Sequence, residues 1–123
     1  MIEKTVIDYL GSALNVPVGP QVPPGPPAKY CTVERRGRDD KNRLQAALIA
    51  VVSAAPSLWE AMNLSEAVRG YMELLPTLRS NVFSCRCSDE YNSTDPETAE
   101  FRYTATFRLT FTDPTDERSQ NNG

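Results

Sequence analysis

Near the C-terminus of the sequence, two segments alternate apolar and polar residues at every second position. In the second segment the apolar positions are Phe101, Tyr103, Ala105, Phe107, Leu109 and Phe111. The polar positions between them are Arg102, Thr104, Thr106, Arg108, Thr110 and Thr112. Because successive side chains of a strand point to opposite faces, this alternation predicts a strand with one apolar face.

The first of the two segments has the same alternation. Its apolar positions are Phe83, Cys85 and Cys87, and its polar positions are Ser84, Arg86 and Ser88. Residues 91–98 separate the segments and contain Asn, Asp, Ser and Pro, which favour turns. Together the segments predict a long antiparallel β-hairpin with a polar, acidic connection.

The N-terminal residues have a helical period instead. Apolar residues recur on one face and predict a helix over Ile2–Leu14. Val16, Val18 and Val22 then favour a short extended piece, which neighbouring prolines confine to a sheet edge or an irregular arm. Residues 20–27 are Pro-rich, and we interpret them as a loop between strands, with a Pro-rich partner motif as the alternative.

Residues 28–55 supply further strands. Alternation predicts a strand over Ala28–Arg35, and residues 36–43 are predicted to form a charged loop with Gly37 as its turn residue. Leu44–Ala55 is ambiguous, because its Ala content favours a helix while Ile49–Val52 favours a buried strand. We assign it to a strand, since a third helix would leave too few strands beside the hairpin.

A second helix is predicted to begin at Ser57, which forms a capping-box pattern with Glu60. Pro76 is expected to end this helix, and Asn63 or Ser65 could divide it. Its apolar stripe consists of Leu58, Met62, Ser65, Val68, Met72 and Leu75. Four residues of the C-terminal strand are expected to face that stripe, namely Tyr103, Phe107, Leu109 and Phe111.

This order of elements predicts an α+β, two-layer domain. Two helices are expected to pack on one face of a mainly antiparallel sheet of four to five strands, which includes the long C-terminal β-hairpin. The single domain is expected to span residues 1–112, followed by a flexible polar tail over residues 113–123. A sequence of 123 residues is long enough for one core and too short for two ordinary domains.

Composition and charge narrow the functional classes. The sequence is 40% hydrophobic and 24% charged, as in a globular domain. Its formal net charge of -3 argues against general affinity for nucleic acid. No apolar run reaches the roughly 20 residues of a membrane-spanning helix, and no N-terminal targeting signal is visible. We therefore expect an intracellular protein without membrane contact.

Candidate chemistry is sparse. Cys31, Cys85 and Cys87 match none of the usual structural zinc spacings, and the sequence contains no His, so we expect free, buried thiols. The acidic connection lacks the pattern of a dedicated calcium loop and is expected to be solvated rather than to hold a general acid–base pair. Its carboxylates are those of Asp89, Glu90, Asp95, Glu97 and Glu100. We predict no enzyme, no cofactor and no metal.

Four segments resemble one protein family. They read "MIEKTVIDYL", "LNVPVGPQVPPGPPAKYCTVERRG", "NRLQAALIAVVSAAPSLWEAMNLSEAVRGYM" and "EYNSTDPETAEFRYTATFRLTF". In this order they are similar to the small tail terminator, or tail completion, proteins of long-tailed phages and prophages. The similarity extends from Met1 to about Thr112. The Pro-rich residues Pro23–Pro27 and the Cys85–Cys87 pair depart from the family pattern.

The resemblance implies a structural protein that catalyses no reaction. Such proteins close into a ring, typically a hexamer, which ends the tail tube and offers a surface to the head. The implied partners are further copies of the chain, the tail-tube protein and the head–tail connector protein. The ring is implied in the virion tail, and we expect the protein to be a monomer when it is free in the host cytoplasm during assembly.

The charged segment between the second and third predicted strands is our candidate for the subunit or partner interface. Its residues carry both signs, so one copy could meet the opposite sign on its neighbour. They are Arg35, Arg36, Arg38, Asp39, Asp40, Lys41 and Arg43. The alternative is a merely solvated turn.

Two other functions remain open for the protein as a whole. One is a head-closure adaptor or minor capsid component, which would use a similar small domain. The other is a host-encoded protein-binding module that uses the Pro-rich arm.

Overall fold

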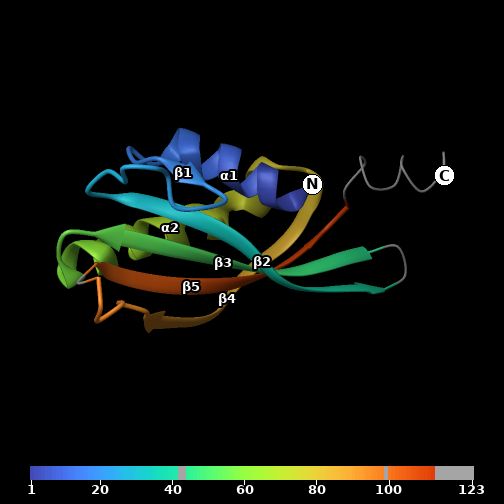
Figure 1. Ribbon diagram of the computed structural model, residues 1–123. Coiled ribbons are helices and arrows are strands. Elements are labelled where there is room, and N and C mark those ends of the chain that lie inside the picture. Colours follow the sequence, from blue (N-terminus) through green and yellow to red (C-terminus); the bar gives the residue numbers. More distant parts are fainter. Residues whose placement is uncertain (42–43, 99, 113–123) are drawn as a thin grey trace.

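The computed structural model describes residues 1–41, 44–98 and 100–112 (Figure 1). Two helices and five strands follow one another in the order α1 (Ile2–Ala13), β1 (Val18–Gly19), β2 (Tyr30–Lys41), β3 (Leu44–Ala55), α2 (Leu58–Leu78), β4 (Val82–Asn92) and β5 (Phe101–Phe111). This composition confirms the predicted α+β class. The predicted polar tail, residues 113–123, lies outside the described residues.

The strands form one sheet in the order β1-β2-β3-β5-β4. The pairs β2–β3, β3–β5 and β4–β5 are antiparallel, whereas β1 runs parallel to β2, with Val18 opposite Cys31. The sheet is therefore mixed. The short extended piece predicted around Val18 is β1, and it lies at the sheet edge as the prolines require.

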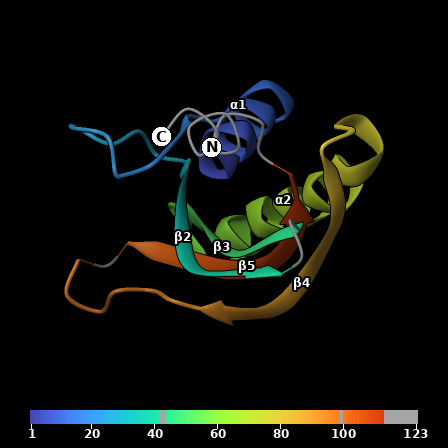
Figure 2. The same cartoon turned by 90° about the vertical axis from the view of Figure 1, so that its right-hand side faces the viewer.

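Both helices lie on the same side of the curved sheet (Figure 2). Helix α2 packs across β3, β5 and β4, and α1 lies beside β1 and β2. The Tyr9 hydroxyl on α1 donates a 2.7 Å hydrogen bond to the Tyr71 carbonyl on α2, which joins the two helices. The opposite face of the sheet, which we call the outer face, carries neither of the two helices of the described residues (Figure 2).

The core lies between α2 and the central strands. Ile49 on β3 pairs with Phe107 on β5, and both are fully buried with Val68 and Met72 of α2. Leu109 and Phe111 are buried as predicted, whereas Tyr103 is only partly buried.

Two residues of the predicted helix stripe do not belong to the buried core: Leu58 is only partly buried, and Met62 is exposed. Met62 is 36% exposed, and the neighbouring Ala61 is buried in its place. The buried positions of α2 follow steps of four and three residues, as the 3.6-residue period requires, at Ala61, Ser65, Val68, Met72 and Leu75. The predicted stripe was therefore wrong at Met62, which lies one residue off this series.

The prediction of a charged loop over residues 36–43 is wrong for residues 36–41. Strand β2 continues to Lys41 and pairs with β3 to its end, with a β-bulge between Arg35 and Gly37. The long strand β3 offers backbone partners over this length, and the bulge accommodates one extra residue. Asn42 and Arg43 lie outside the described residues, and Asp40 and Lys41 are described in their backbone alone.

Helix α2 begins as predicted but ends later. Ser57 is the N-cap, and its hydroxyl oxygen accepts a 3.2 Å hydrogen bond from the Glu60 amide. The helix is continuous through Asn63 and continues past Pro76 to Leu78. A proline in the last turn removes only one hydrogen-bond donor, and the Arg79 amide still donates to the Leu75 carbonyl at 3.0 Å.

Strands β4 and β5 pair antiparallel with two irregularities. They lie between Val82 and Ser84 and between Cys87 and Asp89. The first irregularity breaks the simple alternation on β4, so Val82 is buried while Phe83, predicted to be apolar-facing, is 55% exposed. Bulges change which face a residue occupies, and alternation alone does not reveal them.

Candidate interaction surface

The described part of the predicted interface lies on β2, whose C-terminal half runs with β3 to one end of the sheet (Figure 1). Arg43 lies outside the described residues. Arg35, Arg36, Arg38 and Asp39 are all exposed. They lie on a strand with fixed pairing partners rather than on a free loop. Their side chains are therefore presented in a defined order along the hairpin.

Arg35 and Arg36 each have a named partner within the same chain. Arg35 Nε lies 3.4 Å from Glu3 Oε2 on α1. Arg36 donates a 3.0 Å hydrogen bond to the Tyr91 hydroxyl on β4, and its Nε lies 3.7 Å from Glu34 Oε2. The hydrogen bond to Tyr91 raises the pKa of Arg36. Arg35 and Arg36 thus hold the hairpin against the rest of the domain.

Two other arginines meet on the outer face. Arg86 on β4 pairs directly with Arg108 on β5, and both are exposed. Phe107 and Leu109, the neighbours of Arg108 along β5, are buried under the helices, so Arg108 points to the outer face. Within the described part of the chain, neither guanidinium group forms an ion pair or a hydrogen bond.

A hollow adjoins Arg108 at the base of the projecting hairpin. Leu48 and Ala46 form part of its apolar wall, and Arg38, Asp39 and Gly37 also line it. A Cβ atom at Gly37 would lie 3.5 Å from Leu48 Cδ1, so the missing side chain leaves the face of Leu48 uncovered. We call Arg38, Asp39, Leu48, Arg86 and Arg108 the distal patch. Its chemistry suits a carboxylate carried on an apolar segment.

The opposite end of the sheet carries the acidic connection between β4 and β5. Glu100 accepts hydrogen bonds of 2.6 Å from the Tyr30 hydroxyl and from Arg102 Nε. Partial burial favours the neutral carboxyl, but these two hydrogen bonds outweigh it and lower the pKa of Glu100. The sequence predicts that Glu100 is solvated, because its partner Tyr30 lies 70 positions away in the sequence.

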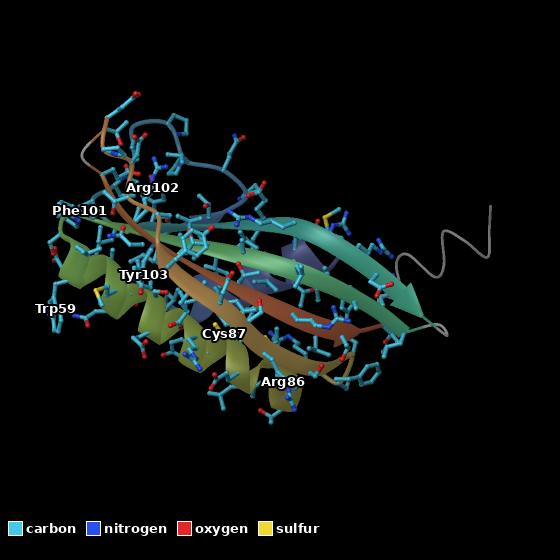
Figure 3. All side chains as sticks on the ribbon, turned by 90° about the horizontal axis from the view of Figure 1, so that it is seen from below. Trp59, Arg86, Cys87, Phe101, Arg102 and Tyr103 are labelled. Carbon is cyan, nitrogen blue, oxygen red and sulfur yellow. The ribbon has the colours of Figure 1, made fainter. Side chains whose placement is uncertain are left out.

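At this end Glu97 and Trp59 are exposed and Asp95 is partly exposed. Asp95 and Glu97 lie in the connection, and the Glu97 amide donates a 2.9 Å hydrogen bond to Asp95 Oδ1. Trp59, on the first turn of α2, is 70% exposed (Figure 3). We call Trp59, Asp95 and Glu97 the proximal end.

The three cysteines are free. Burial raises the pKa of Cys31 to about 11 and that of Cys85 to about 12, and it also raises the pKa of the partly buried Cys87. Among the described residues, no group of three or more His, Cys, Asp or Glu side chains is placed to hold a metal ion. Of the helices in the described ranges, none is both long and apolar enough to cross a membrane.

Sequence reasoning missed Arg86 and Arg108 as a site. Their polar positions on two alternating strands were visible, but their direct pairing depends on the register between β4 and β5. This register cannot be predicted from the local sequence, because two irregularities on β4 shift the pairing between the strands.

The fold is similar to that of a virion protein. No family model and no curated protein matches the sequence. A chain in a solved structure described as "Virion of native gene transfer agent (GTA) particle" has a TM-score of 0.54 and 19% sequence identity. The match covers 88% of this chain and 84% of that chain. At this identity the likeness shows a shared fold.

Proposed function

We propose that this protein is a structural component of a phage-type particle that forms a ring, ends the tail tube and joins tail to head. The observation that carries the proposal is the fold likeness to a chain of a gene transfer agent virion, which covers most of both chains. The sequence resemblance to tail terminator proteins points to the same role. A ring-forming protein needs surfaces for its neighbours and no catalytic centre.

The proposed partners follow from this role. The protein binds further copies of itself in a ring, most simply a hexamer, and it also binds the tail-tube protein and the head–tail connector protein. It is a monomer when free in the host cytoplasm, and it becomes part of the virion tail on assembly. Nucleic acid and membrane are not among its partners.

The charged hairpin remains a proposed interface, with its residues divided between two roles. Arg38 and Asp39 belong to the contact, together with Asp40, Lys41 and Arg43. Arg35 and Arg36 fix the hairpin on the domain, because they are engaged by Glu3, Glu34 and Tyr91. Reversal of Arg36 would therefore disturb the hairpin itself.

The test is complementation of a prophage whose copy of this gene has been deleted. Electron microscopy of the lysate measures tail length and head attachment. The proposal predicts overlong or headless tails without the gene and uniform, head-bearing tails when it is restored. Tails of normal length that merely lack heads would support a head-closure adaptor instead. Normal particles without the gene would contradict any assembly role.

A further inference from the structure

Among the described residues, no carboxylate pairs with the two arginines on the outer face. Like charges directly opposite on neighbouring strands destabilise a sheet, and Arg86 and Arg108 occupy such positions. Asp39 and Asp89 lie on the strands around them, yet among the described residues neither forms an ion pair with the two guanidinium groups. A guanidinium group binds a carboxylate through paired hydrogen bonds. The described residues therefore leave both guanidinium groups open to a carboxylate ligand.

Suitable carboxylates lie at the other end of the molecule. Asp95 and Glu97 are held in a local turn by the hydrogen bond between the Glu97 amide and Asp95 Oδ1. Glu100, by contrast, is engaged by Tyr30 and Arg102. The turn thus presents two carboxylates beside a cluster whose charge is already satisfied.

One copy cannot bring these two groups together. Arg108 lies seven residues along β5 from Phe101, where the acidic connection ends, and a strand rises about 3.3 Å per residue. The intervening strand is rigid, since β5 pairs with β3 and β4 on both sides. Figure 3 shows Trp59 and Phe101 at one end of the domain and Arg86 displaced along it. Opposite charges at the two ends of a rigid domain favour head-to-tail contact.

We propose that the distal patch of one copy binds the proximal end of the next, with Asp95 and Glu97 facing Arg86 and Arg108 of its neighbour. This inference rests on the proposed function and specifies the contact that builds the ring. The contact joins two different surfaces, so it is heterologous, and heterologous contacts close into rings when the rotation permits.

Trp59 adds an apolar anchor to the same contact. It is the only Trp in the sequence, and it lies at the proximal end with most of its surface exposed. Trp is enriched among residues that dominate binding energy at interfaces. On the distal side, Leu48 provides uncovered apolar surface beside Arg108. Burial of Trp59 on assembly would shift its fluorescence emission to shorter wavelengths.

The test uses two charge-reversed forms of the full chain. One carries Arg86→Glu and Arg108→Glu, and the other carries Asp95→Lys and Glu97→Lys. Each is expressed alone in the gene-deleted prophage strain, and then both are expressed together. Each form alone should lose tail termination. Together they should restore it, because alternating copies place opposite charges at every contact of an even-numbered ring.

Two controls separate this contact from other effects. Lys4→Glu reverses one exposed cation on α1. It is the control for the single substitution Arg108→Glu, which should weaken tail termination. A third form neutralises the carboxylates of the tail with Asp113→Asn, Asp116→Asn and Glu117→Gln. This form should assemble as the wild type does. Loss of assembly in it would assign the carboxylates to the tail and overturn the proposal.

The outcomes distinguish this inference from the proposed function. Normal tails with the Arg86→Glu and Arg108→Glu form overturn the inference and leave the function intact. Failure of the mixed forms to restore termination, while each remains folded by circular dichroism, also overturns it. If the wild-type gene itself does not restore tails, the proposed function fails first. An emission shift of Trp59 on assembly of the wild type supports the contact.

Discussion

Tyr30 on β2 donates a 2.6 Å hydrogen bond to Glu100, a residue 70 positions away that precedes β5. Arg102 donates to the same carboxylate oxygen, Oε1. These contacts connect the start of β2 with the start of β5 across β3, which lies between them. A carboxylate that the sequence places in a solvated turn is therefore part of the framework at the proximal end.

Tyr30→Phe should lower the free energy of unfolding by about 1.5–3 kcal/mol near neutral pH, because it removes a hydrogen bond to a charged group. The control is Tyr103→Phe, since the Tyr103 hydroxyl forms no hydrogen bond within the described residues. Urea denaturation of both variants measures the difference. Equal stability of the two would contradict a structural role for the Tyr30–Glu100 contact.

The same contact predicts a pH dependence on both sides of neutrality. The lowered pKa of Glu100 means that its contribution is present above the ordinary value of 4.5 and is lost as pH falls through the folded value. Burial and then the Glu100 contact raise the pKa of Tyr30 from 10.0 to about 12, so its contribution is lost as pH rises through that window. The stability difference between wild type and Tyr30→Phe should become smaller both at acid pH and at alkaline pH.

Phe107→Ala should unfold or nearly unfold the protein. Phe107 is fully buried between β3 and α2, and truncating such a residue costs roughly 3–5 kcal/mol of a domain's total of about 5–15 kcal/mol. Arg108→Ala, one position along β5 and exposed, is the matched control and should be mild. Thermal melts followed by circular dichroism compare the two. Equal melting temperatures would mean that the two faces of β5 are wrongly assigned.

Gly70→Ala should stabilise the protein by about 0.5–1 kcal/mol. Gly70 is an exposed position inside α2, and an added Cβ atom would have no non-local neighbour within 4 Å. Gly25→Ala should have the opposite sign, because the φ angle of Gly25 is +56°, which is costly for a residue with a Cβ atom. If both variants shifted the melting temperature in the same direction, Gly70 and Gly25 would not differ in backbone conformation as the structure indicates.

Cys87 should be the thiol that reacts first in the folded protein. It is partly buried, whereas Cys31 and Cys85 are almost fully enclosed, and the thiolate is the reactive form. Burial, followed by the nearby Glu90 carboxylate, raises the pKa of Cys87, so its alkylation rate should still be rising above the ordinary thiol pKa of 9.0. Mass spectrometry of alkylated peptides locates the modified residue. Modification of Cys31 at a similar rate in the native state would contradict its burial.

Most element types could be predicted from the sequence, because their signals are local. Alternation defined β5, the helical period defined α1, and the Ser57–Glu60 pattern defined the start of α2. The composition of Leu44–Ala55 favours both a helix and a strand. Only the need for enough strands beside the hairpin predicts a strand there. That assignment is confirmed by β3, which pairs along its length with β2 and β5.

The tertiary structure decided what depends on a partner strand. Residues 36–41 contain charges and a glycine typical of a loop, yet pairing with β3 makes most of this segment a strand. Likewise, bulges on β4 expose Phe83 and bring Arg86 opposite Arg108. The physical reason is that cross-strand hydrogen bonds join residues far apart in sequence, so their register is fixed by the whole sheet and not by local propensity.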